Sequence, residues 1–312
     1  MILHQASKAL FYALADSPRL QHLASRYGAR KPDRLARRLI AGEAVDDAIG
    51  AARRLAADGR LSTLRLLGQP AVTMADADTA TRARLSFIEA MTAAGIDRHI
   101  SLTLTELGLM VDRATAVDNL RRVLDGAGAR DMSVCIDMEG SSFTQVTHDV
   151  FETMWQQGYR NVGIAVQSAL PRSRADVERL NRLGARVRLV KGAYKEPKGV
   201  AYQDPRQVDA AFVELMQQLL TGGTYPAIAT HDPAMIAATR AFAANRGTKP
   251  DGFEFQMFYG VGRARQQALV SEGFRVRVYV PCGREWFQYL MRQMGDRTAN
   301  IGFVIRGIVG KV

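Results

Sequence analysis

One run of residues, RLVKGAY from Arg188 to Tyr194, combines the side chains best suited to chemistry. It reads as an apolar strand that ends in cations, a small-residue turn (Gly192-Ala193) and an aromatic ring. In α/β barrels, ligands and reactive groups gather where strands end. The run therefore predicts that Arg188, Lys191 and Tyr194 face a functional site, although an edge strand with solvent-directed cations has the same composition.

Several other strand-like segments also end in polar side chains. They comprise Gln69, Thr103, Thr105, Asp137, Glu139, Gln167, Thr230, His231, Asp232, Gln256, Tyr259 and Tyr279. At one shared mouth, the amides and hydroxyls could hydrogen-bond a heterocycle and a sugar-like chain, while cations could bind phosphates. The set predicts a site for a large polar cofactor.

The segment 284–296 adds a candidate helix near the end of the chain. Tyr289, Arg292 and Asp296 share one helical face, and Gln293 lies one turn after Tyr289. An ion pair between Arg292 and Asp296 on the surface explains this spacing. Alternatively, the helix closes the mouth of the site and directs Tyr289 and Arg292 toward an anionic ligand.

Two other chemistries stay open from the residues alone. Lys191 could be the Schiff-base nucleophile of a flavin-free barrel lyase if desolvation lowered its pKa. His231 and Asp232 could begin a metal site, but no further His or Cys lies at ligand spacing, so we expect no metal. Gly260-Val-Gly262 is more typical of a turn than of a dinucleotide-binding loop.

The scaffold is predicted by short apolar runs that alternate with helical stretches. Eight such runs occur, at 61–67, 100–107, 133–138, 161–167, 187–191, 227–230, 253–258 and 276–281. This order implies a parallel sheet with right-handed crossovers, and eight units in roughly 230 residues fit a closed (βα)8 barrel of the TIM type. We expect an N-terminal helical arm over 1–60 and an α/β barrel over 61–312, with a C-terminal helix closing the mouth.

Composition restricts the class of protein. The 312 residues include 47% hydrophobic and 23% charged residues, as in ordinary globular proteins. Lys and Arg outnumber Asp and Glu by 42 to 31, a formal net charge of +11. Because the cations are scattered and form no Lys/Arg-rich tract, we expect no nucleic-acid partner.

The cellular setting is also predicted from the sequence. Both cysteines, Cys135 and Cys282, lie in apolar strand-like segments, which fits reduced thiols. The N-terminus lacks the apolar core of a signal peptide, and no stretch reaches the ~18 apolar residues of a membrane span. We expect a cytoplasmic protein, with peripheral contact at the inner membrane face left open by the positive charge.

From residue 61 onward the chain resembles the proline dehydrogenases, flavoenzymes built on a distorted (βα)8 barrel. The combination of VRLVKGAY with YLxR is specific to that family. The matching stretches follow the family order: LxLLG at 64–68, SLTLTELGL at 101–109, IDME at 136–139, VGIAVQ at 162–167, VRLVKGAY at 187–194, ATHD at 229–232, EFQMFYG at 254–260, and VYVPCG, YLMRQ and TAN within 278–300.

The resemblance implies bound FAD and hydride transfer to flavin N5 from the carbon next to a secondary amine, giving an imine such as 1-pyrroline-5-carboxylate. It implies a quinone or similar electron acceptor. The implied catalytic residues are Arg188 near N5, Asp137 and Tyr279. The implied cofactor-binding residues are Gln167, Arg188, Lys191, Gly192, Ala193, Thr230, His231 and Gln256. The implied substrate-binding residues are Thr103, Tyr194, Tyr289, Arg292 and Gln293.

The residues that bind the substrate carboxylate depart from the family pattern. That pattern has a Lys in the second strand and two adjacent Args on the final helix, where this chain has Thr103, Arg292 and Gln293. One cation of three remains. A charge-assisted hydrogen bond contributes roughly 1.5–3 kcal/mol, so each loss should weaken carboxylate binding about ten- to a hundredfold.

Other departures lie nearby. Arg65 and Gln69 stand where the family has acids, and Lys195 stands where it has an aromatic ring. Losing acids together with cations indicates a rewired pocket, and Arg65 is a candidate replacement cation. Proline is the default substrate, with a proline-like or other amine as the alternative. A non-catalytic descendant that keeps FAD for binding is a third hypothesis.

Overall fold

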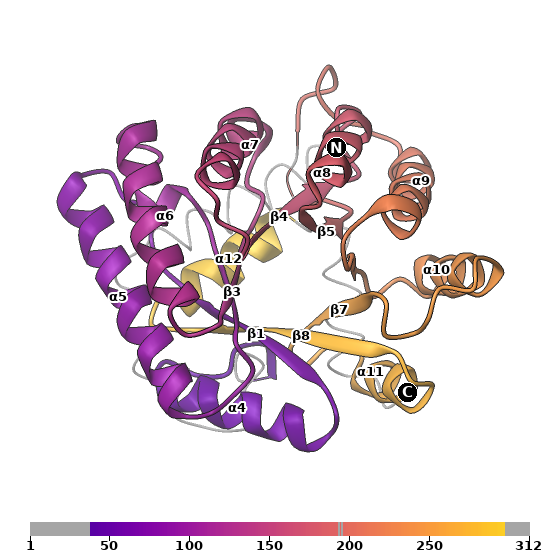
Figure 1. Cartoon of the computed structure of the whole chain (residues 1–312), viewed down its shortest axis with the longest axis horizontal. Coiled ribbons are helices and arrows are strands. Elements are labelled where there is room, and N and C mark those ends of the chain that lie inside the picture. The colour runs from indigo at the N-terminus through magenta and orange to yellow at the C-terminus, as the bar shows by residue number, and fades with distance from the viewer. Residues whose placement is uncertain (1–37, 193, 195, 297–312) are drawn as a thin grey trace.

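The computed structural model describes residues 38–296 apart from 193 and 195. Within this part, parallel strands hydrogen-bond in sequential order and close into a barrel, β1-β2-β3-β4-β5-β6-β7-β8 (Figure 1). The strands are β1 Leu61–Leu66, β2 His99–Leu102, β3 Ser133–Ile136, β4 Val162–Gln167, β5 Arg186–Val190, β6 Ala227–Ala229, β7 Glu254–Phe258 and β8 Arg275–Cys282. The predicted (βα)8 barrel is confirmed.

Helices surround the barrel and connect its strands (Figure 1). They are α5 Met74–Ala93, α6 Arg113–Gly128, α7 Ser141–Gln156, α8 Ser173–Leu183, α9 Pro205–Gly222, α10 Pro233–Asn245 and α11 Arg263–Ser271, with α4 Val45–Ala57 before β1 and α12 Trp286–Asp296 after β8. Local sequence fixes several helix starts. Asp204 and Asp232 each cap a helix whose first residue is proline, and these residues fix where α9 and α10 begin.

Alternation along the strands separates an apolar outer layer from a polar interior. On β5, Val187 and Leu189 are buried in the apolar core, while Arg188 between them points into the barrel. At the amino ends of the strands, Arg277 bonds Glu254 (2.9 Å) and Asp97 (2.6 Å). These buried ion pairs fill the barrel interior at the amino ends of the strands. The interior at the carboxyl ends is left for a functional site.

The segment before the barrel is only partly described. Residues 1–37 of the predicted helical arm lie outside the described residues. In the remainder, α4 packs on β1 and β8, and its buried face of Ala48, Ala51, Ala52 and Leu55 belongs to the main core. The described helices include none long and apolar enough to cross a membrane.

The second strand is shorter than predicted. The apolar run 100–107 was expected to be a strand throughout, but β2 ends at Leu102 and Thr105–Leu107 form a 3-10 turn, η1. The turn directs Glu106 inward, where its carboxylate accepts a hydrogen bond from the backbone N–H of Gly68 (2.9 Å). Burying that carboxylate among its partners outweighs continuing the strand.

Both cysteines are free and buried, on β3 and β8. Burial raises the pKa of Cys135 to about 11 and that of Cys282 to about 12. The two thiols form no disulfide with each other in this structure, and their reduced state stays a prediction.

Candidate active site

A cavity of about 860 Å³ opens at the carboxyl ends of the barrel strands. Side chains from all eight strands or the loops that follow them line it. The predicted site residues it brings together are Thr103, Asp137, Gln167, Arg188, Lys191, Gly192, Tyr194, Thr230, His231, Gln256, Tyr279 and Tyr289. Ala193 and the side chains of Arg292 and Gln293 lie outside what the structure describes.

Asp137 is the centre of a polar network at the base of this cavity. It follows β3 and forms a salt bridge with Arg188 Nη1, and the Tyr279 hydroxyl donates to its Oδ2 (2.8 Å). Arg188 Nη1 also donates to Ser101 Oγ (2.9 Å). Burial disfavours the charged guanidinium, but acidic neighbours including Cys135 and Asp137 raise the pKa of Arg188. Burial and the Asp137 carboxylate raise the pKa of Tyr279, so the phenol stays protonated.

Some polar atoms of this network have no partner within the described residues. Arg188 Nε and Nη2 and Gln256 Oε1 are buried and make no hydrogen bond there. Since buried polar atoms are almost always paired, unpaired donors and an unpaired acceptor beside a large cavity fit a polar ligand bound against them. The N–H donors on Arg188 Nε and Nη2 suit a ligand that presents acceptors.

Lys191 lies between two carboxylates at the other side of the cavity. Its Nζ is 2.5 Å from Asp209 Oδ1 on α9 and 2.7 Å from Asp232 Oδ2. Burial alone would lower the pKa of Lys191, but the hydrogen bonds that its ammonium donates to the two carboxylates raise it. A Schiff-base nucleophile needs the opposite shift, so this geometry weighs against the lyase hypothesis.

The turn after Lys191 brings the backbone close to β4. Gly192 has φ +114°, and a Cβ there would lie 3.1 Å from both Gln167 Oε1 and Ala169 Cβ. Gln167 Nε2 donates to the carbonyl of Glu139 (3.1 Å), which fixes the amide against the cavity wall. Glycine is therefore required by both conformation and space.

His231 forms a flat part of the wall. Its Nε2 accepts from the backbone N–H of Phe258 (2.9 Å), and its ring stacks on Phe258 with centroids 5.6 Å apart. Because Nε2 and the Asp232 carboxylate already have partners, the pair does not present a metal site. Across residues 38–296, apart from the gaps at 193 and 195, no group of three or more His, Cys, Asp or Glu residues could hold a metal.

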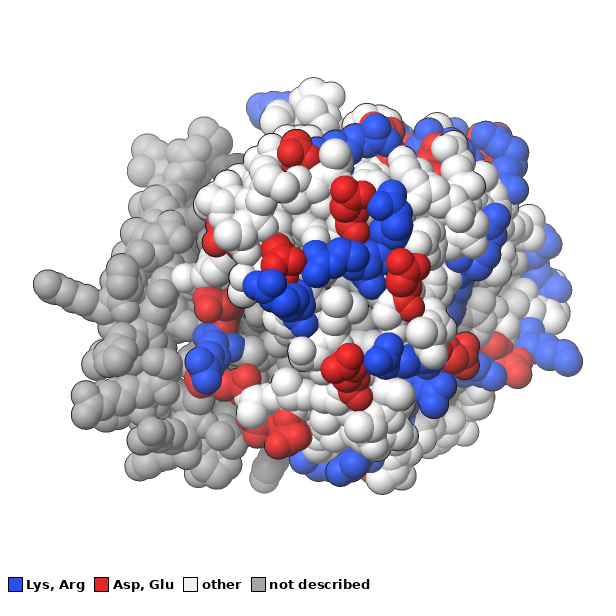
Figure 2. Space-filling view, turned by 60° about the vertical axis from the view of Figure 1, so that its left-hand side comes forward, with Lys and Arg blue, Asp and Glu red and all other residues white. Residues whose placement is uncertain are grey.

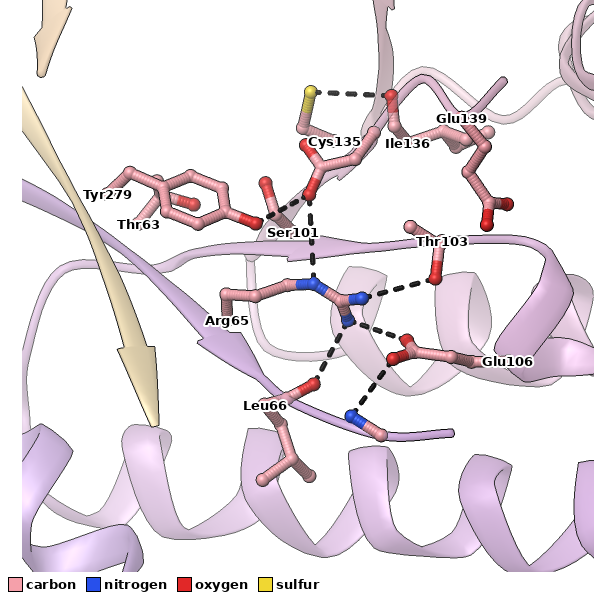
Figure 3. A network of polar contacts seen from close by, with 12 residues as sticks. Thr63, Arg65, Leu66, Ser101, Thr103, Glu106, Cys135, Ile136, Glu139 and Tyr279 are labelled. Carbon is pink, nitrogen blue, oxygen red and sulfur yellow. Dashed lines mark hydrogen bonds and ion pairs between the residues drawn. The ribbon is translucent and has the colours of Figure 1, made fainter. Parts of the chain in front are cut away.

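The structure adds a buried ion network that the strand-end pattern did not identify (Figure 3). Arg65 Nη1 donates to Glu106 Oε2 (2.7 Å), Arg65 Nη2 donates to Thr103 Oγ1 (3.1 Å), and Arg84 forms a salt bridge with the same Glu106 oxygen. Burial alone would raise the pKa of Glu106, but the two guanidiniums hold it at about 2. The one signal in the sequence is that Glu106 is a lone acid within an apolar run. Its alternation alone predicts that this run is a strand.

Glu139 is a second carboxylate of unusual character. It accepts from Thr105 Oγ1 (2.6 Å) and from the Thr105 N–H (3.2 Å) and lines the cavity. Burial raises the pKa of Glu139 to about 7, despite these hydrogen bonds. The group changes charge near neutral pH.

The start of α12 lies over one side of the cavity, where Gln288 and Tyr289 join the lining. Trp286 is buried with Ile40 and Leu67, and its indole N–H donates to Glu43 Oε1 (2.8 Å). These contacts hold the helix start against the rim of the barrel.

The sequence profile described as "Proline dehydrogenase" matches residues 48–306. "Proline dehydrogenase 1" of Bacillus subtilis (strain 168) is 36% identical over 302 residues, 97% of this chain and 99% of the relative. "Proline dehydrogenase" of Deinococcus radiodurans is 36% identical over 316 residues, 99% of each. The chain belongs to the proline dehydrogenase family.

Solved structures of proline dehydrogenase domains share the fold. Proline utilization A (PutA) from Bdellovibrio bacteriovorus superposes with a TM-score of 0.80 at 24% identity, over 87% of this chain and 33% of that one. PutA from Bradyrhizobium japonicum, as the D778Y mutant, has a TM-score of 0.73 at 26% identity, over 92% and 34%. The chain thus spans about a third of these longer PutA proteins.

Proline dehydrogenases are FAD-dependent flavoenzymes, and the cofactor of this family member is FAD. The cavity fits it chemically. A flavin ring presents carbonyl and ring-nitrogen acceptors, which match the unpaired donors on Arg188 Nε and Nη2, and its ring N–H matches the unpaired Gln256 Oε1. The missing Cβ at Gly192 keeps the wall of the cavity open beside Gln167.

Proposed function

We propose that this chain is an FAD-dependent dehydrogenase that oxidises L-proline to 1-pyrroline-5-carboxylate. The observation that carries the proposal is the Arg188–Asp137–Tyr279 network at the base of the cavity. It occurs in a chain that matches proline dehydrogenases over nearly its full length.

Bound FAD supplies the acceptor for the hydride that leaves the carbon next to the amine nitrogen. In this proposal the residues that hold FAD are Gln167, Arg188, Lys191, Gly192, Ala193, Thr230, His231 and Gln256. The protein's own contribution is positioning, a fixed electrostatic environment and exclusion of water rather than proton transfer to carbon.

Asp137 and Tyr279 have positioning roles in this proposal. Asp137 holds the Arg188 guanidinium by a salt bridge, which leaves Arg188 Nε and Nη2 for the ligand. The Tyr279 hydroxyl fixes the other carboxylate oxygen. The substrate would lie among Thr103, Tyr194, Tyr289, Arg292 and Gln293, with α12 closing the mouth.

The electron acceptor is proposed to be a quinone or a similar carrier, reached by peripheral contact at the inner face of a membrane. The formal charge of +11 supports attraction to anionic lipid. The face bearing α5 and α6 is not the favoured contact, because acidic and basic side chains are interspersed over it (Figure 2). On that face Arg122 pairs with Asp78 at 2.9 Å.

A visible absorption spectrum of purified protein tests the proposal, followed anaerobically after addition of L-proline. Flavin bands that bleach with proline are the expected result. Bands that persist with proline and bleach with another secondary amine would move the substrate to the alternative. A protein that is colourless and does not take up FAD would overturn the proposal.

A further inference from the structure

Arg65 differs from Arg84, the other guanidinium of its ion network, in facing the cavity. Its side chain lines the cavity together with Thr103 and Glu106, and the residue is 6% exposed. Arg84 binds the same Glu106 oxygen from α5 but is absent from the cavity lining. The two guanidiniums share one carboxylate, and one of them also reaches the ligand space.

The hydrogen bonds of Arg65 leave part of its guanidinium for a ligand. A guanidinium carries five N–H donors. Within the described residues three are used, toward the Leu66 carbonyl (3.0 Å), Glu106 Oε2 (2.7 Å) and Thr103 Oγ1 (3.1 Å). The Nε–H makes no hydrogen bond within the described residues, and the Asp137 carboxylate lies 3.8 Å from Nε, beyond hydrogen-bond range.

The balance of charge at this side of the cavity favours an anion. Three guanidiniums, those of Arg65, Arg84 and Arg188, lie with the carboxylates of Glu106 and Asp137. A third carboxyl nearby, that of Glu139, has its pKa raised to about 7 by burial, so one positive charge is in excess when Glu139 is protonated. Burial alone would lower the pKa of Arg65, but Glu106, Tyr279 and Asp137 raise it, and the group stays charged.

At the opposite side of the cavity, negative charge is in excess. There the Lys191 ammonium lies against two carboxylates. An amino-acid substrate with one carboxylate is therefore attracted to the end of the cavity formed by β1, β2 and β3. The proposed function assigns Arg188 Nε and Nη2 to FAD, which leaves Arg65 as the cation for the substrate among the described side chains at that end.

We propose that Arg65 binds the substrate carboxylate and so determines that the enzyme prefers an amino acid over a plain cyclic amine. The inference rests on the proposed function. Thr103 holds the guanidinium in place by accepting from Nη2, and Glu106 fixes it from the other side. Arg65 on β1 thereby supplies the positive charge for the carboxylate, because the residue that follows β2, Thr103, offers only a hydroxyl.

Steady-state kinetics with two amines tests this role. L-Proline carries the carboxylate, and pyrrolidine is the same ring without it. Arg65→Gln is expected to raise KM for proline about 10- to 100-fold, as for a lost charge-assisted contact, and to change KM for pyrrolidine less than about threefold. Equal increases for both amines would show a general structural effect and would overturn the inference.

Arg84→Gln is the matched control. It removes the same charge from the same Glu106 oxygen without touching the cavity wall. We expect a loss of stability, because the pair is buried, but KM for proline within about threefold of the unmodified enzyme, because Arg84 does not reach the cavity and Glu106 keeps Arg65 as its partner. If Arg84→Gln raises KM as much as Arg65→Gln, Arg65 acts only through Glu106 and the inference is wrong.

A binding measurement separates this inference from the proposed function. Calorimetry of FAD-loaded protein with cyclopentanecarboxylate, a carboxylate without an amine, should show binding that Arg65→Gln weakens at least about tenfold and Arg84→Gln does not. If neither amine is oxidised, the proposed function fails, yet the calorimetry still decides whether Arg65 binds a carboxylate. Should Arg65→Gln not fold, Arg65→Met keeps much of the side-chain length without the charge and is expected to weaken binding at least about tenfold; unchanged binding by that variant would overturn the inference.

Discussion

Arg188 on β5 and Asp137 beyond the end of β3 form a salt bridge across the mouth of the barrel. They are separated in the sheet by β4, so the bond crosses the interior instead of following a neighbouring strand. Tyr279 on β8 reaches the same carboxylate from the other side. One acid thus connects three strands at the base of the cavity.

Asp137→Asn is expected to destabilise the protein and to abolish most turnover. Removing one partner of a buried ion pair costs about 3–5 kcal/mol in free energy of unfolding, because the other charge stays buried. Since Asp137 is partly accessible to solvent, we expect a cost at the lower end of this range. Thermal unfolding and proline oxidation measure the two effects, with kcat/KM falling at least about 100-fold. Asp209→Asn is the control, because Lys191 keeps Asp232, and the free energy of unfolding should change by less than about 1 kcal/mol.

Tyr279→Phe removes the hydrogen bond from the hydroxyl to Asp137 and keeps the aromatic ring. The net contribution of such a bond is about 0.5–1.5 kcal/mol, so kcat/KM for proline should fall roughly 2- to 10-fold with FAD content unchanged. Tyr159→Phe makes the same change at a surface bond to Asp125 and should leave kcat/KM as it was. A loss of flavin in Tyr279→Phe would contradict this prediction.

Glu139 should make stability depend on pH. Burial raises its pKa to about 7, so the folded protein binds this proton more tightly than the unfolded chain does. The contribution of the protonated Glu139 carboxyl to the free energy of unfolding is fully present below the ordinary glutamate pKa, and it is lost as pH rises through about 7. Glu139→Gln stays neutral, and the Thr105 hydroxyl can bond an amide as well as a carboxyl.

Chemical denaturation between about pH 5 and about pH 8 tests the behaviour of Glu139. The difference in unfolding free energy between Glu139→Gln and the unmodified protein should shift in favour of the variant by about 1–3 kcal/mol over this range. A difference that does not change with pH would show that Glu139 titrates in its ordinary range.

Gly192→Ala should impair FAD retention. The φ of +114° is costly for alanine, and the new methyl would lie 3.1 Å from Gln167 and Ala169. We expect a loss of about 1–3 kcal/mol in stability and a reduced flavin-to-protein ratio after gel filtration. Gly95→Ala also has a positive φ but open space around its Cβ, so it should lower stability slightly and retain FAD fully.

The barrel and most of its strand ends could be predicted because they depend on local pattern. Alternation within RLVKGAY places Arg188 inward whatever the rest of the chain does. The partners of these residues could not be predicted in the same way. Asp209, which binds Lys191 from near the start of α9, is 18 positions away in a helix whose phase relative to the barrel depends on packing.

The turn at Glu106 was missed for a related reason. Its segment is apolar and strand-like, and only two arginines brought from β1 and α5 make burial of the carboxylate favourable. Nothing within a few residues of Glu106 shows that they will arrive there. The position of Arg65 likewise required the register of β1 against β2.

The two buried thiols can be used to measure how the barrel opens. Cys135 lies on β3 and Cys282 at the end of β8, and their raised pKa values keep them unreactive while they are buried. Labelling by a thiol reagent then requires an opening that exposes β3 or β8. If both sites modify at one rate, the barrel opens as a unit; different rates identify the side that opens first, without any probe having to be introduced.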